Sequence, residues 1–196
     1  MKRITDYFIL LLFAPLWIPA LGVVAALVKL TSPGPALFTQ KRVGRGGATF
    51  TICKFRTMRT DTPGDVPTHL FENPDAYITP VGRVLRKTSL DELPQIFNIL
   101  KGDMTLVGPR PALWNQYDLI CEREKYGAND ILPGLTGLAQ VNGRDNLTIE
   151  EKAERDGYYR RHMRFGLDAK ILLLTVINVI GHSGVREGRA AGLPRG

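Results

Sequence analysis

The sequence is poor in cysteine and histidine, the residues that build disulfide frameworks and zinc sites. Its two cysteines, Cys53 and Cys121, lie far apart and form no CxxC pattern. Its three histidines, His69, His162 and His182, match neither HExxH nor a zinc-finger spacing. These absences exclude a disulfide framework and zinc sites of those types, and they indicate a reducing compartment.

Acidic residues are also scarce relative to basic ones. The chain of 196 residues carries 26 Lys and Arg against 19 Asp and Glu, a formal net charge of +7. This excess favours an anionic partner, which can be a nucleic acid, a phosphorylated substrate or an acidic membrane surface. The length suffices for one domain with a hydrophobic core and one attachment.

Long hydrophobic runs are few, and the run at residues 8–28 would reach about 32 Å as a straight helix, just enough to span a bilayer. A cleaved signal peptide fits poorly, because the run is long and its cleavage site is poor. Pro15 and Pro19 disfavour a straight spanning helix. Basic residues flank the run on both sides, and positive charge prefers the cytoplasmic face. A re-entrant helix that bends near Pro15 is therefore slightly favoured, while the spanning form stays open.

Two adjacent carboxylates, Asp91 and Glu92, stand in the segment SLDELPQ at residues 89–95. A helix over residues 92–101 that ends at Gly102 is predicted by an apolar face at helical spacing, formed by Leu93, Ile96, Phe97 and Leu100. In a structural interpretation, Asp91 is the N-cap of this helix and Glu92 is a favourable charge at its positive end. In a functional interpretation, the pair supplies a nucleophile and a metal ligand. The two interpretations are compatible, because a helix N-terminus also attracts phosphate.

A strand at residues 49–58 is expected to present Lys54 and Arg56 on one face. Two such cations can belong to a solvated edge, or they can hold a diphosphate. A first short strand at residues 36–38 and a basic, glycine-rich turn at residues 40–47 complete the β-hairpin. The sequence thus predicts a helix-rich α+β fold with a small hairpin or sheet.

Two arginines lie close to the carboxylates in sequence. Arg86 precedes them on a predicted short helix. Arg110 lies between Pro109 and Pro111, which stiffen the backbone and fix its direction. A rigid arginine suits bidentate phosphate contact, and a stiff turn with an exposed arginine is the alternative. Residues 132–144 are dense in glycine and polar amides and predict a binding loop.

Several motifs in one order resemble the bacterial sugar transferases, which are the monotopic phosphoglycosyl transferases. They are KFRTM (residues 54–58), RKTSLDELPQ (86–95), KGDM (101–104), VGPRP (107–111), PGLTG (133–137) and QVNGR (140–144). The resemblance extends from the N-terminal apolar run to about residue 182. The length resembles the small members of the family, which hold only the catalytic core.

The resemblance implies a re-entrant membrane helix at residues 1–30, a catalytic domain at residues 31–182 and a tail at residues 183–196. The protein is then monotopic in the bacterial inner membrane, bound to membrane lipids, with its catalytic domain on the cytoplasmic face. The family often breaks its helix at a Ser-Pro pair. Here Ala14 and Pro15 stand at that place, so the proline is kept and the hydroxyl is lost.

The resemblance also implies transfer of a sugar phosphate from a UDP-sugar to polyprenol phosphate, with release of UMP and a need for Mg²⁺. Asp91 would form an aspartyl-phosphosugar, and Glu92 would assist as metal ligand or base. Asp91 and Glu92 are thus the candidate catalytic residues and metal ligands. The candidate substrate-binding residues are Lys54, Arg56, Arg86 and Arg110 for phosphate, and Gln140, Asn142 and Arg144 for the nucleotide or sugar.

Two other classes of function compete with this one. A membrane-anchored basic binding protein for acidic lipid or nucleic acid explains the charge and the apolar run. It leaves Asp91 and Glu92 without a task, and the sequence has no nucleic-acid motif. A paired-carboxylate glycosidase fits poorly, because its two acids normally stand about 5–10 Å apart on different elements.

Overall fold

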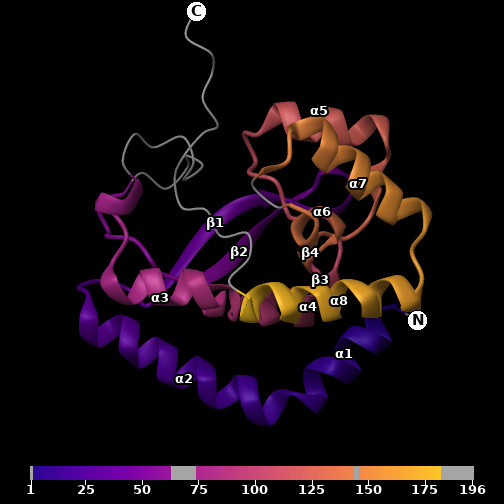
Figure 1. Ribbon diagram of the computed structural model, residues 1–196. Coiled ribbons are helices and arrows are strands. Elements are labelled where there is room, and N and C mark those ends of the chain that lie inside the picture. The colour runs from indigo at the N-terminus through magenta and orange to yellow at the C-terminus, as the bar shows by residue number, and fades with distance from the viewer. Residues whose placement is uncertain (1, 63–73, 144–145, 182–196) are drawn as a thin grey trace, which may run out of the picture.

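The computed structural model describes residues 2–62, 74–143 and 146–181 (Figure 1). Helices dominate the described part, and two small two-stranded sheets accompany them. The prediction of a helix-rich α+β fold with a small hairpin is therefore confirmed. Arg144 and the predicted tail at residues 183–196 lie outside the described residues.

The N-terminal apolar segment forms two helices, α1 (Lys2–Leu12) and α2 (Ala14–Thr31). They meet at Phe13, so the break lies two residues before Pro15, near the bend that the sequence predicted. Pro15 stands in the first turn of α2, where its missing N–H leaves no hydrogen bond unmade. In Figure 1 the two helices form an open V beneath the rest of the protein. The helix α2 is long and apolar enough to cross a membrane, and most of it is exposed.

Polar contacts attach the far arms of this V to the domain. On α1, Lys2 Nζ donates to a carboxylate oxygen of Asp168 at 2.7 Å, and Asp6 accepts from the Thr105 hydroxyl at 2.5 Å. After α2, the Arg56 guanidinium donates to the carbonyl oxygens of Ser32, Pro33 and Pro35 at 2.7–3.0 Å. These contacts fix both ends of the apolar segment to the domain.

The hairpin consists of β1 (Leu37–Val43) and β2 (Thr49–Phe55), which pair antiparallel from Leu37 with Phe55 to Val43 with Thr49. The first strand is longer than predicted, and the turn is only the 3₁₀ segment η1 (Arg45–Gly47). Backbone pairing continues to Val43 because the positive φ angles needed to turn the chain come only at Gly46 and Gly47. As a result, Gln40 and Arg42 belong to a strand.

The two carboxylates lie in a 3₁₀ turn, η4 (Leu90–Glu92), between α3 (Pro80–Thr88) and α4 (Gln95–Lys101). The prediction that Asp91 caps the following helix is wrong, because that helix begins after Pro94 and has no side-chain cap. Successive i to i+3 hydrogen bonds carry the chain through the turn instead. The predicted stop at Gly102 is confirmed, with φ at 98°.

The buried face of α4 differs in part from the predicted one. Ile96 is buried as expected, but Phe97 and Leu100 are exposed. Asn98 is buried instead, because its side chain completes the edge of β2. Its Nδ2 donates to the Thr51 carbonyl at 2.8 Å, and its Oδ1 accepts from the Cys53 N–H at 3.1 Å. This pairing holds the middle of α4 against β2.

A second sheet joins β3 (Thr105–Val107) in parallel to β4 (Gly134–Thr136), followed by α6 (Leu138–Val141). The predicted binding loop at residues 132–144 is therefore partly a strand and a short helix. Two glycines of this segment allow its backbone to lie close to the backbone of Gly108. A Cβ on Gly134 would lie 2.1 Å from Gly108 N, and one on Gly137 would lie 2.1 Å from Gly108 O. No side chain fits at either place.

The described part of the chain has five further helical elements. They are α5 (Tyr117–Lys125), the 3₁₀ segments η3 (Pro74–Ala76) and η5 (Ala128–Asp130), α7 (Ile149–Arg161) and α8 (Phe165–Ile180). Ile99, Met104, Val107, Tyr159 and Ile171 form the centre of the core. Figure 1 shows α4 and α8 on the side of the domain that faces the V of α1 and α2.

Candidate active site

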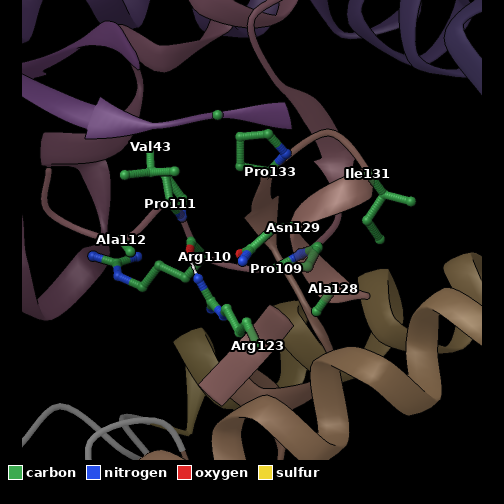
Figure 2. Close-up of a pocket in the computed structure, with 11 residues that line it drawn as sticks. Val43, Pro109, Arg110, Pro111, Ala112, Arg123, Ala128, Asn129, Ile131 and Pro133 are labelled. Carbon is green, nitrogen blue, oxygen red and sulfur yellow. Dashed lines mark hydrogen bonds between the residues drawn. The ribbon is translucent and has the colours of Figure 1, made fainter. Parts of the chain in front are cut away.

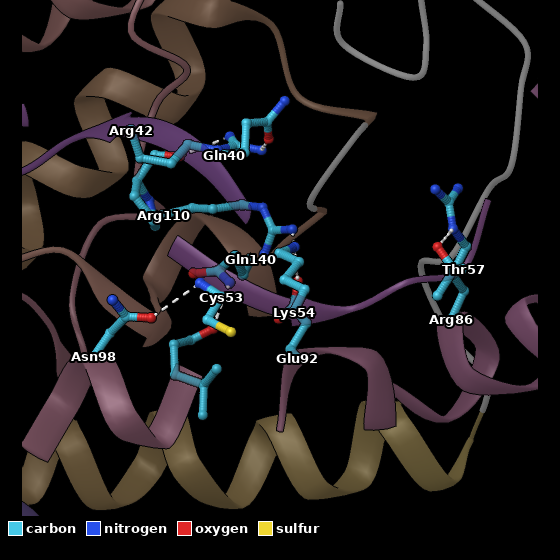
Figure 3. A network of polar contacts seen from close by, with 12 residues as sticks. Gln40, Arg42, Cys53, Lys54, Thr57, Arg86, Glu92, Asn98, Arg110 and Gln140 are labelled. Atoms are coloured by element: carbon cyan, nitrogen blue, oxygen red, sulfur yellow. Dashed lines mark hydrogen bonds and ion pairs between the residues drawn. The ribbon is translucent and has the colours of Figure 1, made fainter. Parts of the chain in front are cut away.

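Two cations from distant parts of the chain share one oxygen of Glu92. Lys54 Nζ from β2 and Arg110 Nη2 lie 2.8 and 2.7 Å from Glu92 Oε1 (Figure 3). The Lys54 and Glu92 side chains are 14% and 10% exposed, and that of Arg110 is 34% exposed. The fold thus brings together three of the predicted site residues in a mostly buried ion-pair cluster.

Asp91 stands beside this cluster and is half-buried. Burial raises the pKa of its carboxyl, and the neighbouring charge of Glu92 raises it further. Lys54, Arg86 and Arg110 act in the opposite direction and lower it. Asp91 is therefore a partly desolvated carboxyl under the field of three cations, an environment typical of a functional acid group.

Lys54 is buried more deeply than Arg110, the other cation of the cluster. Burial lowers the pKa of its ammonium, the charge of Glu92 raises it, and the charge of Arg110 lowers it again. A buried ammonium is stable only when it is paired and hydrogen-bonded. Glu92 provides that pairing, so the position of Lys54 depends on Glu92.

The backbone before Asp91 is in an unusual conformation. Ser89 has φ at 57° and ψ at 16°, and among the described residues it is the only non-glycine with positive φ. This left-handed residue ends α3 and turns the chain into η4. Residues held in such conformations cost about 1 kcal/mol or more and cluster at functional sites.

Arg86 projects from α3 and is held by Thr57, which lies two residues after the end of β2. Its Nε donates to the Thr57 hydroxyl at 2.9 Å. The helix lies very close to this segment, because a Cβ on Gly82 would lie 2.0 Å from the Thr57 carbonyl oxygen. The glycine therefore sets the distance between α3 and the segment after β2, and with it the position of Arg86.

Arg110 is held through its backbone as well as by the flanking prolines. Its carbonyl accepts from Arg123 Nη1 at 2.9 Å, and Arg123 is paired with the buried carboxylate of Asp156 at 2.6 Å. Figure 2 shows Arg123 reaching toward the segment from Pro109 to Pro111. The prediction of a rigidly placed arginine agrees with this geometry.

Arg42 is a further candidate that the sequence did not suggest. It donates to Pro111 O at 3.1 Å and to Gln40 Oε1 at 2.6 Å, while its buried Nε has no partner among the described residues. Burial, followed by the nearby charge of Arg110, lowers its pKa to about 10, against an opposing effect of Glu92. The sequence placed it in a turn, so its inward direction was not foreseen.

Two of the predicted substrate-binding residues have structural contacts of their own. All three nitrogens of the Arg56 guanidinium donate to carbonyl oxygens after α2, so it and Lys54 do not act together. Asn142 is exposed and donates to the Leu138 carbonyl at 2.8 Å. Gln140 lines a cavity together with Glu92, as described below. Arg144 lies outside the described residues.

The described residues contain no group of three or more His, Cys, Asp or Glu side chains that could hold a metal ion. Mg²⁺ is commonly bound by only one or two carboxylates, with substrate phosphates and water as the other ligands. The adjacent carboxylates of Asp91 and Glu92 fit that donor set. A magnesium site at this pair stays a prediction.

Comparison with known proteins gives a consistent set of relatives. The profile of a family described as bacterial sugar transferase matches residues 1–182. The UDP-glucose:undecaprenyl-phosphate glucose-1-phosphate transferase of Caulobacter vibrioides is 43% identical over 91% of this chain and 69% of its own length. The uncharacterized sugar transferase EpsL of Bacillus subtilis is 42% identical over 83% of this chain and 78% of its own length.

Other relatives are longer proteins. The UDP-N-acetylgalactosamine-undecaprenyl-phosphate N-acetylgalactosaminephosphotransferase of Aeromonas hydrophila is 37% identical, and 94% of this chain matches 45% of that protein. The UDP-glucose:undecaprenyl-phosphate glucose-1-phosphate transferase of Escherichia coli is 41% identical, and 90% of this chain matches 39% of it. The named relatives thus act on different sugars.

Proposed function

The chain belongs to the bacterial sugar transferase family and is a phosphoglycosyl transferase, and we propose that it moves a sugar phosphate from a UDP-sugar to polyprenyl phosphate. The products are polyprenyl-diphospho-sugar and UMP. The observation that supports this most is the sharing of Glu92 Oε1 by Lys54 and Arg110 beside Asp91. That cluster joins carboxylates to cations that can bind a diphosphate.

The reaction proceeds in two displacements at one phosphorus. The Asp91 carboxylate attacks the phosphorus that carries the sugar, and the bond from this phosphorus to the bridging oxygen breaks. UMP leaves with that oxygen. A phosphate oxygen of the polyprenyl phosphate then attacks the same phosphorus, and the Asp91 carboxylate leaves unchanged. An aspartyl-phosphosugar therefore forms and is consumed in each cycle.

Charge neutralisation is the main requirement of both steps, because an anion attacks an anion each time. Lys54, Arg86 and Arg110 already act on Asp91 through their charges. The Arg110 guanidinium can bridge donor phosphate oxygens, since its position is fixed by the backbone contact with Arg123. Arg42 adds a second guanidinium close to Arg110. Together these residues offset the charge that builds up at the phosphorus.

Magnesium would be held by Asp91 and Glu92 together with the donor diphosphate, and it would supply further positive charge there. Glu92 also keeps Lys54 and Arg110 in place through their shared contact. Its role is thus to position the cations as well as to assist the metal.

The two N-terminal helices place this site at the membrane in our proposal. Exposed apolar side chains cover α1 and α2, including Ile4, Leu11, Leu16, Ile18 and Leu30. Both far arms of the V return to the domain, and basic residues flank both ends. A re-entrant segment that dips into one leaflet from the cytoplasmic face fits this arrangement, because only one side of the membrane then meets the charges.

The test is covalent labelling without acceptor. Purified protein with Mg²⁺ is incubated with UDP-sugars carrying a radiolabelled sugar, and protein-bound label and released UMP are measured. Wild type should retain label, and Asp91→Asn should lose it by roughly a thousandfold or more. Asp61→Asn is the matched control, because Asp61 is exposed and pairs with Arg59.

The outcomes distinguish two-step transfer, direct transfer and a protein without transferase activity. Label that disappears with Asp91→Asn and persists with Asp61→Asn supports the two-step reaction and identifies the sugar. Turnover with polyprenyl phosphate but no label on the wild-type protein would point to direct transfer. Absence of both label and turnover with every donor tried would contradict the proposal and revive the alternative of a basic binding protein for acidic lipid.

A further inference from the structure

A cavity of about 220 Å³ lies between η4, α6 and α8, and Glu92, the neighbour of Asp91 in sequence, lines it. Glu92 and Leu93 form one part of its wall, and Gln140 faces it from α6. Leu172 and Val179 contribute from α8. The proposed reaction at Asp91 gives this space no role so far.

The polar groups in the wall are largely bonded to the protein itself. Thr136 and Thr175 share a hydrogen bond at 2.7 Å, and Asn178 Nδ2 donates to the Val141 carbonyl at 3.1 Å. Gln140 Nε2 donates to the Leu135 carbonyl at 3.0 Å, whereas the buried Oε1 of Gln140 has no partner among the described residues and is the exception. The cavity therefore presents mainly methyl and methylene groups to an occupant.

An apolar cavity of this kind takes up a hydrocarbon more readily than a sugar. Sugar hydroxyl groups buried against bonded polar groups would remain unpaired, which is costly. A cavity of about 150 Å³ lined by aliphatic side chains is known to accept benzene. Since an isoprene unit has one carbon fewer than benzene, 220 Å³ suits roughly one to two such units.

We propose that this cavity binds the first isoprene units of the polyprenyl phosphate acceptor, an inference that rests on the function proposed above. The exposed Lys87, at the end of α3, lines the same space and can meet the acceptor phosphate. Glu92 lies on the same wall, so the phosphate enters next to Asp91. The hydrocarbon then extends away from the reacting phosphorus.

The helix α8 connects the cavity to an apolar surface. Leu172, Thr175 and Val179 line the cavity, at helical spacing. The adjacent row on the same helix contains Leu173 and Val176, which are 62% and 55% exposed. A chain that leaves the cavity over this helix meets apolar side chains, as a lipid tail in a membrane requires.

The experiment narrows the cavity with Val179→Trp and compares it with Phe165→Trp at the exposed start of the same helix. Phe165 is 72% exposed and lies seven residues before Leu172, the first residue of α8 that lines the cavity, and tryptophan is favoured at membrane interfaces. UMP release is measured in one detergent with the UDP-sugar panel, against undecaprenyl phosphate and the ten-carbon geranyl phosphate. The KM values for acceptor and donor are determined separately.

We expect Val179→Trp to raise the acceptor KM by about tenfold or more for both acceptors, with the donor KM within about twofold of wild type. Phe165→Trp should match wild type. Val179→Ala, which removes two methyl groups from the wall, should raise the acceptor KM roughly three- to tenfold. If Val179→Trp fails to fold, the acceptor KM of Val179→Ala tests the inference instead.

Four results would overturn the inference. If the two tryptophan variants have the same acceptor KM, or if Val179→Ala leaves the acceptor KM unchanged, the cavity does not hold the acceptor chain. If Val179→Trp raises the donor KM instead, the cavity holds the sugar. None of these three results affects the proposed function. If the wild-type protein releases no UMP with any donor and acceptor, the function and this inference fail together.

Discussion

Replacing Glu92 with glutamine tests the central cluster, because it removes the charge that Lys54 and Arg110 share and keeps the shape of the side chain. Both cations donate to Oε1, at 2.8 and 2.7 Å. A hydrogen bond to a charged group contributes about 1.5–3 kcal/mol, against about 0.5–1.5 kcal/mol for a neutral one. The contact with buried Lys54 therefore loses about 1 kcal/mol.

The contact with Arg110 loses less, because the Arg110 side chain is 34% exposed and water screens it. The nearby carboxylate of Asp91 still attracts both cations. We therefore expect Glu92→Gln to lower the free energy of unfolding by about 1–2 kcal/mol in total. For a chain of this size that lowers Tm by roughly 2–8 °C.

Thermal unfolding of the purified protein in one detergent measures this shift. Glu122→Gln is the matched control, since Glu122 pairs with the largely exposed Lys125 on α5 and should change little. A double-mutant cycle with Lys54→Met should show a coupling free energy of about 1 kcal/mol between Lys54 and Glu92. An unchanged or higher Tm for Glu92→Gln, or zero coupling, would refute the argument that Glu92 holds these cations.

Three further predictions concern the supports of the site. Burial and the charge of Glu92 raise the pKa of Asp91, so the folded protein keeps the Asp91 proton to a higher pH than the unfolded chain. The free energy of unfolding therefore falls as the pH rises from the pKa of Asp91 in the unfolded chain to that in the folded protein. Asp91→Asn should remove this fall, so the Tm of the variant should equal that of wild type in acid and exceed it near neutral pH. Gly82→Ala should cost about 1–3 kcal/mol and weaken labelling, because its Cβ would lie 2.0 Å from Thr57 O, whereas Gly22→Ala in open space on α2 should stabilise by up to about 1 kcal/mol in denaturation. Asn98→Ala should cost about 2–4 kcal/mol by leaving the Thr51 carbonyl and the Cys53 N–H of β2 unpaired, while Asn142→Ala, at an exposed site, should cost less in the same measurement.

Local patterns predicted those features that depend on neighbouring residues. Pro15 marked the place where the apolar segment breaks, and Gly102 marked the end of α4. The flanking prolines indicated a fixed direction for Arg110, and the structure adds the contact with Arg123. Each of these signals acts through backbone conformation within a few residues, so one sequence is enough to read it.

Features that depend on contacts across the fold could not be predicted. The expected strand places Arg56 on the same face as Lys54, yet β2 ends at Phe55. Arg56 instead donates to carbonyl groups after α2, which lie more than twenty residues away in sequence. Arg42 faces the site only because β1 extends to Val43. The glycines at 134 and 137 indicated a binding loop, whereas they permit the close backbone contact with Gly108.

The environments of the two carboxylates give them different tasks, although they are neighbours in sequence. Glu92 is buried and already accepts from two cations at one oxygen, so a nucleophilic attack by that oxygen would break both contacts. Asp91 is half-buried, and its pKa is raised by burial rather than lowered by direct pairing. A carboxylate that accepts few hydrogen bonds is the better nucleophile. A carboxylate that accepts hydrogen bonds from two cations is better suited to hold those cations in place. The 3₁₀ turn is compatible with this division, because successive residues of such a turn are rotated by about 120° and adjacent side chains therefore point in different directions.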